Sequence, residues 1–394
     1  MRSMLAASVS LFLAMPATAQ VISCVTNSQQ LQAALVLAAF NGQDDVIRIA
    51  TGHYPIPPGG FFYNTESVHA DDKHLTLIGG WSELFGNPCG QQLTQNPFYT
   101  VLDGGGIDRV LRIRPGRHGD VTVRLLTLAN GRATHSNGPA IGGGLYIDPV
   151  ADNNTSVHRI ERNAFINNVS DSIVGALDLS TGVVIATGRR LVINNLFWGN
   201  RALLGIGAVR IQQRGGEGVW FTNNTVIGNS VSLPQPDYPG AVQLGGSADR
   251  HVYNNILWGN TLSDLHIETN TPLYLHSNNI GHRTGYLGST AASGNMSTNP
   301  QFGPGFLSFT PGRTSPLVDA GIHPGPLPSI WHLPERDLND SPRVVGPAVD
   351  IGAYENFRVF ASDFEDQQEP DGDGSLPAAL CEAVDCEDPQ QRGE

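Results

Sequence analysis

NNLFWGN at Asn194–Asn200 recurs as NNTVIGN at Asn223–Asn229 and as NNILWGN at Asn254–Asn260, after a weaker copy, RNAFINN, at Arg162–Asn168. The last Asn of each copy advances by 32, 29 and 31 residues (168 to 200 to 229 to 260). A fixed period in this range indicates a repeat architecture. The copies hold β-branched and aromatic residues, contain no Pro and show no helical spacing. Each repeat is therefore predicted to be a strand-bearing coil of a solenoid.

The doubled Asn of each repeat has a predicted structural role. Because successive coils lie about 4.8 Å apart, equivalent Asn side chains can hydrogen-bond amide to amide along the stack. The predicted ladder consists of Asn195, Asn224 and Asn255. The first Asn of each pair tolerates the left-handed conformation of a tight corner. A row of Asn side chains presented to a glycan is the alternative interpretation.

Apolar and aromatic residues follow each doubled Asn. One position predicts a stacked core column of Phe165, Phe197, Val226 and Leu257. Trp198 and Trp258 occupy the next position. Their large rings favour packing in the core or under a loop, with a sugar-binding platform as the alternative.

A second short strand, preceded by Gly or Ala, alternates apolar and polar residues in every regular repeat. Side chains alternate across a strand, so the apolar members should face inward. These are Leu145/Ile147, Leu177/Leu179, Val209/Ile211 and Val242/Leu244. The outward positions form one column of Tyr146, Asp178, Arg210 and Gln243, and a second of Asp148, Ser180, Gln212 and Gly245. This polar stripe is the candidate ligand-binding surface, and an extended polysaccharide fits it.

Asp148, Asp178 and Arg210 form the candidate catalytic set within this stripe. Strand geometry places the two carboxylates roughly 8 Å apart, a separation compatible with inverting glycoside hydrolysis. The alternative, which we favour, is that Asp178 pairs with Arg210 on the adjacent coil and that both are solvated surface residues.

The remainder of the chain divides by composition. Residues 1–19 resemble a secretory signal peptide, which predicts a secreted or surface-exposed protein, with the periplasm as an alternative location. Residues 20–60 are expected to form a cap helix, with Ser28 as its N-cap, and a first strand. Residues 61–298 are expected to form the coils, 299–356 a segment that closes the other end, and 357–394 an acidic, disordered tail. Residues 55–72 and 82–98 are expected to be loops.

An exported chain permits disulfides, and pairing is expected within Cys24/Cys89 and within Cys381/Cys386.

Charge excludes some partners. The chain has 23 Lys and Arg against 36 Asp and Glu, a formal net charge of −13. Without a basic footprint, neither nucleic acid nor an anionic membrane is an expected partner. No apolar stretch after the signal segment reaches membrane-spanning length.

Several longer motifs resemble a known group of proteins. They are LTLIGGW (75–81), TVLDGGG (100–106), VTVRLLTLANG (121–131) and SPLVDAG…PRVVGPAVDIGAYE (315–355). Together with the Asn repeats they resemble bacterial secreted proteins of the pectin-lyase-like fold that carry a choice-of-anchor Q type C-terminal segment. The resemblance implies an all-β fold, a single right-handed parallel β-helix with an N-terminal helical cap.

Activity does not follow from the resemblance, because this fold hosts lyases, hydrolases, esterases and binding proteins. Lys73 is the only lysine and lies outside the repeats, which disfavours a lysine base. The arginines of RVLRIRPGRHGD (109–120) only loosely resemble a pectate lyase element. The first hypothesis is a non-catalytic protein that binds polysaccharide or cell-surface glycan along a lateral face; the alternatives are a polysaccharide lyase or inverting glycoside hydrolase, and an autotransporter passenger.

No cofactor is expected, with calcium as the one alternative. The candidate calcium ligands, which could instead hold turns, are Asp337, Asn339, Asp340 and Asp350.

Overall fold

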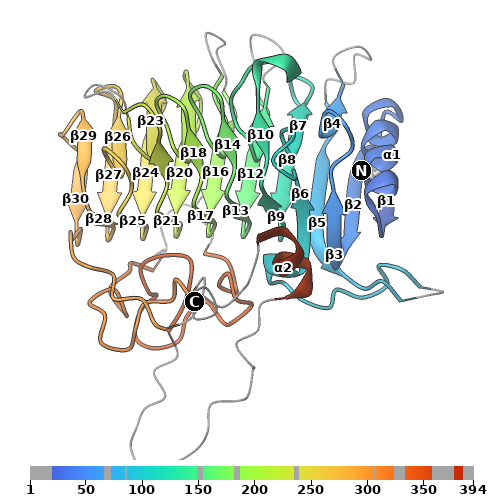
Figure 1. Ribbon diagram of the computed structural model, residues 1–394. Helices are drawn as coiled ribbons and strands as arrows, with labels where there is room; N and C mark the ends of the chain where they lie inside the picture. Colours follow the sequence, from blue (N-terminus) through green and yellow to red (C-terminus); the bar gives the residue numbers. More distant parts are fainter. Residues whose placement is uncertain are drawn as a thin grey trace, which may run out of the picture.

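Parallel strands stack into a solenoid in the computed structural model, which describes residues 20–65, 72–84, 87–148, 154–181, 187–234, 239–304, 308–323, 333–356 and 377–384 (Figure 1). The described strands form four sheets of ten, eight, eight and four strands, named here sheets A, B, C and D. Every strand in these sheets pairs in parallel with the equivalent strand of the neighbouring coil. The predicted parallel β-helix is confirmed.

The strands of sheet A, in order, are β1 (Gln20–Val25), β2 (Asp44–Ala50), β5 (Leu75–Trp81), β8 (Val121–Arg124), β12 (His158–Glu161), β16 (Arg189–Ile193), β20 (Gly218–Thr222), β24 (Arg250–Tyr253), β27 (Leu273–His276) and β30 (Ala291–Ser293). Those of sheet B are β3 (Gly52–Pro55), β6 (Thr100–Asp103), β9 (Thr127–Ala129), β13 (Ala164–Ile166), β17 (Leu196–Trp198), β21 (Thr225–Ile227), β25 (Ile256–Trp258) and β28 (Asn279–Ile280).

Sheet C contains β4 (Phe61–Asn64), β7 (Leu111–Arg114), β11 (Leu145–Ile147), β15 (Leu177–Asp178), β19 (Val209–Gln213), β23 (Val242–Gly246), β26 (Leu265–Ile267) and β29 (Arg283–Gly285). Sheet D contains β10 (Arg132–Ala133), β14 (Val169–Ser170), β18 (Arg201–Ala202) and β22 (Ser230–Val231). The helices are α1 (Ser28–Phe40), α2 (Ala378–Val384) and the short 3₁₀ turns η1 (Pro97–Tyr99) and η2 (His135–Asn137).

Two tight corners shape each regular coil. The chain leaves sheet A at the first Asn of the doubled pair, where Asn194, Asn223 and Asn254 have φ of 56°, 56° and 55°. It leaves sheet B at the Gly-Asn step, where Gly199 and Gly228 have φ of 66° and 64°. Glycine suits this left-handed position because it has no Cβ. The second corner was not predicted. Each regular repeat was expected to hold two strands, but the corners divide it into short strands that belong to four sheets.

The predicted Asn ladder is confirmed and is longer than expected. Asn195 Nδ2 donates to Asn224 Oδ1 (3.0 Å), and Asn224 Nδ2 donates to Asn255 Oδ1 (3.0 Å). The same bond links Asn163 to Asn195, Asn255 to Asn278 and Asn278 to Asn295. A second ladder, at the Gly-Asn corner, joins Asn168, Asn200, Asn229 and Asn260 and ends on Asp264. All members except the terminal Asn295 and Asn260 are buried, which argues against the interpretation as a glycan surface.

The core lies between the sheets. Phe165, Phe197, Val226 and Leu257 are fully buried and paired in register. The rings of Phe165 and Phe197 stack with centroids 4.7 Å apart and planes 9° from parallel. All eight residues predicted to face inward from the second strand are also buried. The core column and the inward pattern are therefore confirmed.

The N-terminal end is covered as predicted, with local differences. Helix α1 buries Leu31, Leu35 and three alanines against the first coil, but Asn27 rather than Ser28 is its N-cap, since the Asn27 side chain accepts the Gln30 N–H. Strand β1 was not predicted, and β4 lies within the expected loop 55–72.

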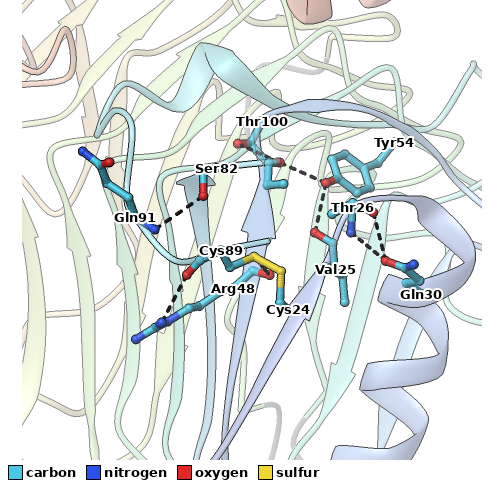
Figure 2. The surroundings of a disulfide bond; sticks show 11 residues. Cys24, Val25, Thr26, Gln30, Arg48, Tyr54, Ser82, Cys89, Gln91 and Thr100 are labelled. Carbon is cyan, nitrogen blue, oxygen red and sulfur yellow. Dashed lines mark hydrogen bonds between the residues drawn. A yellow bond between two sulfur atoms is a disulfide. The ribbon is translucent and has the colours of Figure 1, made fainter. Parts of the chain in front are cut away.

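The Cys24–Cys89 disulfide ties β1 to the loop after β5, with Cα atoms 5.7 Å apart (Figure 2). In the same view, the Arg48 side chain reaches the Cys89 carbonyl (3.3 Å). This confirms the first predicted pair. Cys381 is disulfide-bonded, while Cys386 of the second predicted pair lies outside the described residues.

The C-terminal segment was predicted to close the far end of the solenoid. It instead folds back beneath sheet B (Figure 1). We call residues 308–323 and 333–356 the C-terminal strap. The Ala353 N–H donates to Thr225 Oγ1 (3.0 Å), and Asp340 Oδ2 accepts the Gln95 N–H (2.8 Å). Trp198 and Trp258 pack under the strap, which confirms a packing role. The apolar residues Leu338, Tyr354 and Ile351 explain this position, because they are buried against sheet B rather than against the terminal coil.

The predicted disorder of 357–394 is wrong for residues 378–384. These residues form α2, whose Leu380 is fully buried in the same cluster as Phe98 and Val101. His53 Nδ1 lies 3.0 Å from Glu382 on this helix. Residues 357–376 and 385–394 of the acidic tail lie outside the described part of the chain.

Candidate functional site

The outer face of sheet C presents the polar stripe that the sequence predicted. In register, Tyr146 on β11 neighbours Asp178 on β15, followed by Arg210 on β19 and Gln243 on β23. The column extends beyond the predicted residues at both ends. The added members are Phe62, Arg112, His266 and Thr284.

Asp148 lies at the centre of a dense ionic cluster. Its Oδ2 is 2.5 Å from Arg112 Nη2 and 2.9 Å from Arg114 Nε, and its Oδ1 accepts the Tyr146 hydroxyl (2.9 Å). Burial raises the pKa of Tyr146 above its ordinary value, so the phenol keeps its proton and acts as a donor. The carboxylate is thus held from three sides.

Asp178 is paired with Arg210 across the coil boundary, as the alternative interpretation predicted. Arg210 Nε donates to Asp178 Oδ2 (3.1 Å), Nη2 reaches the same oxygen, and Asp178 Oδ1 accepts the Ser180 N–H (2.8 Å). The Asp178 side chain is 0% exposed and that of Arg210 is 14% exposed. The pair is not solvated surface, however, because it is buried.

Aromatic rings frame the arginines of this face. The Arg112 guanidinium lies 5.5 Å from the Phe62 ring centroid and 5.7 Å from that of Tyr146. Arg109 lies 5.2 Å from the Tyr146 ring, but its nitrogens donate to the carbonyls of Pro139, Ile141 and Gly142. Burial lowers the pKa of Arg109 to about 10. Arg109 therefore has a structural role, in contrast to a lyase arginine that faces substrate.

The other predicted binding residues differ in accessibility. Tyr146 and Gln243 are only 7% and 9% exposed, and Ser180 is 8% exposed with no hydrogen-bond partner for its Oγ in the described part of the chain. Gln212 is half-buried, and its Nε2 donates to Glu268 (2.9 Å) on the coil of β26. Outward orientation was predicted correctly from alternation, whereas exposure was not. Arg112, Arg114, Gln212 and Glu268 form the more accessible part of the surface.

The candidate calcium ligands hold turns in the strap. Asp337 Oδ1 accepts the N–H groups of Asn339 and Ser341, and Asp350 accepts those of Asp319 and Asn356. Within the described residues, no group of three or more His, Cys, Asp or Glu is arranged to hold a metal ion. The carboxylates of Asp337 and Asp350 thus act as acceptors for backbone N–H groups.

A stacked column on the outer face of sheet A was missed. The Trp220 and His251 rings stack at 4.5 Å, and those of His251 and Tyr274 at 4.8 Å. Each lies four residues before a ladder Asn (224, 255 or 278). An aromatic ring four residues before a ladder Asn is therefore the sequence signal that identifies this column.

Comparison with protein families, with curated proteins and with solved structures finds no match for the chain. Among the described residues, no helix is long and apolar enough to cross a membrane.

Proposed function

We propose that the protein binds a polysaccharide or cell-surface glycan along the outer face of sheet C. The observation that carries this proposal is the polar column from β4 to β26, in which the more accessible Arg112, Arg114, Gln212 and Glu268 lie beside buried polar groups and the rings of Phe62 and Tyr146. Sugars need this combination, because hydroxyl groups require polar partners and ring faces require apolar ones. The spacing of ~4.8 Å between coils suits one sugar unit per coil.

A binding role agrees with the state of the two carboxylates. Inverting hydrolysis needs one carboxyl group that gives a proton to the leaving group and one that activates water. Asp148 and Asp178 are both committed to ion pairs with arginine. Hydrolysis or elimination at this face is kept as the alternative outcome of the test.

The arginines at one end of the face favour an acidic glycan in particular. Arg112 and Arg114 lie beside Asp148 in the more accessible part of the face. A guanidinium group is a bidentate partner for a carboxylate or a sulfate group. We expect uronate-containing or sulfated polysaccharides to bind more tightly than neutral ones, with an affinity that falls as salt increases.

Export of the chain is part of the proposal. The Cys24–Cys89 disulfide is compatible with an oxidising compartment. Residues 1–19, which resemble a signal peptide, lie outside the described residues. The membership of the pectin-lyase-like group likewise stays a prediction.

A glycan pull-down and titration with purified protein tests the proposal. Arg112→Gln should weaken binding at least tenfold, because it removes a guanidinium group from the accessible part of the face. The variant should still fold, because Arg114 and Tyr146 continue to hold Asp148. The matched control is Arg189→Gln on sheet A, since Arg189 also pairs with a carboxylate, Glu217, on the next coil. Equal effects of the two variants would reject sheet C as the binding face.

The same samples test for catalysis. Reducing ends and unsaturated products are measured after incubation with acidic and neutral polysaccharides, with Asp178→Asn in parallel. Product formation that disappears in Asp178→Asn would replace the binding proposal with an enzyme. Binding without product supports the non-catalytic role.

A further inference from the structure

Helix α1 has a second apolar face, which points away from the solenoid. Its inner face buries Leu31 and Leu35, whereas Val36, Leu37 and Phe40 are 45%, 68% and 58% exposed. The helix lies at the N-terminal end of the stack of coils (Figure 1). A helix that is apolar all round is typically buried on every side, so this end of the molecule is expected to have a partner.

The exposed residues of α1 follow the spacing of a helix that pairs with another helix. The sequence steps by four, three and four residues (29 to 33 to 36 to 40) through Gln29, Ala33, Val36 and Phe40. All four side chains are exposed. This is the spacing of the seam between two packed helices, and we call these residues the outer seam. Part of the seam borders an open groove whose other wall is the turn after β3, formed by Pro55, Ile56 and Pro57.

The outer seam is complementary to itself. A two-fold axis that passes between positions 34 and 35 lays the seams of two copies against each other in antiparallel orientation. Val36 of one copy then faces Ala33 of the other, and Phe40 faces Gln29. Each pair joins a bulky side chain to a small or flexible one, so the two helices can approach closely.

The distribution of charge favours a second copy of this chain as the partner. The chain has a formal net charge of −13, but residues 20–43 contain no Asp, Glu, Lys or Arg. Copies of an acidic protein repel each other least where their surfaces carry no charge. The same lack of charge disfavours an anionic membrane, which attracts basic residues, and a glycan, whose hydroxyl groups need polar partners.

We propose that α1 is a self-association surface, through which two copies pair end to end by antiparallel packing of their outer seams. A helix of 13 residues is ~20 Å long and ~10 Å wide, so the contact is smaller than the ~800 Å² per partner of a standard interface. We therefore expect a reversible dimer with a Kd on the order of 10 μM. Because the contact lies at the end of the solenoid, the inference does not depend on glycan binding at sheet C.

Sedimentation velocity of the purified protein, from well below to well above this Kd, tests the proposal. The wild type should shift from monomer to dimer as its concentration rises. Val36→Glu should weaken the dimer at least tenfold, because it places an unpaired charge in an apolar contact. The matched control is Leu287→Glu, which puts the same charge on another exposed leucine (67%) after β29, in the last coil. This variant should leave the monomer–dimer equilibrium unchanged.

A double variant tests the antiparallel arrangement. Val36→Glu combined with Ala33→Lys should restore the dimer, because the new lysine of one copy then faces the new glutamate of the other. Unchanged circular dichroism spectra show that the variants fold, as expected for exposed positions.

Three results would overturn the proposal: a wild type that stays monomeric at every concentration, equal weakening by Val36→Glu and Leu287→Glu, or a double variant that does not recover. Co-sedimentation of a monomeric wild type with phosphatidylcholine vesicles would assign the outer seam to a lipid surface and would also overturn it.

Discussion

Asn224 offers a direct test of how much the Asn ladder stabilises the solenoid. Its Oδ1 accepts the backbone N–H (3.0 Å) and the Nδ2 (3.0 Å) of Asn195. Its Nδ2 donates to the Val192 carbonyl (2.9 Å) and to Asn255 Oδ1 (3.0 Å). The residue is completely buried, so water replaces none of these bonds after truncation to alanine.

The cost of Asn224→Ala follows from those contacts. The Asn195 N–H loses its acceptor inside the protein, and a buried orphan donor costs about 1–3 kcal/mol. The remaining lost bonds contribute about 0.5–1.5 kcal/mol each, partly offset because Asn195 Nδ2 also donates to the Ile160 carbonyl. We expect the free energy of unfolding to fall by about 3–5 kcal/mol.

Asn223→Gly is the matched control from the same doubled pair. Asn223 is equally buried, but its amide makes no side-chain hydrogen bond in the described structure, and its φ of 56° is well tolerated by glycine. We expect a change below about 1 kcal/mol. Urea denaturation measures both variants, and hydrogen exchange of the Asn195 amide reports the local loss. Equal costs for the two variants, or unchanged protection of that amide, would refute the reasoning.

Three further predictions concern the two ends of the chain. Removing the Cys24–Cys89 disulfide, which spans 65 residues, should lower the free energy of unfolding by about 4 kcal/mol by the loop-entropy relation; an unchanged urea midpoint under reducing conditions contradicts this. Burial raises the pKa of Glu355 from 4.5 to about 8, so its contribution to stability is present below pH 4.5 and is lost as pH rises towards 8. Thermal unfolding between pH 5 and 9 should show this decline, and Glu355→Gln should flatten it; identical profiles are the contrary result. Asp340→Ala removes the acceptor of the Gln95 N–H at the far contact of the C-terminal strap, and we expect faster limited proteolysis of the strap with an unchanged circular dichroism spectrum; equal cleavage rates would show that this contact does not hold it.

The sequence by itself determined the coil. The recurring Asn pair predicted the solenoid, the ladder of Asn195, Asn224 and Asn255, and the core column that contains Phe197. Alternation predicted which face of the second strand is buried. These features are readable because each coil repeats the same local geometry, so one residue type returns at the same place in the stack.

Only the tertiary structure decided which surfaces remain available. The C-terminal strap has no repeat partner, and its apolar residues fit sheet B as well as the solenoid end when judged by composition alone. Its position follows from contacts between distant residues, such as Asp340 with Gln95. The same holds for Asp148, whose partners Arg112 and Arg114 come from the preceding coil. Periodicity places a residue on a face, whereas burial and ion pairing depend on what the rest of the chain brings to that face, and that sum of long-range contacts exists only after folding.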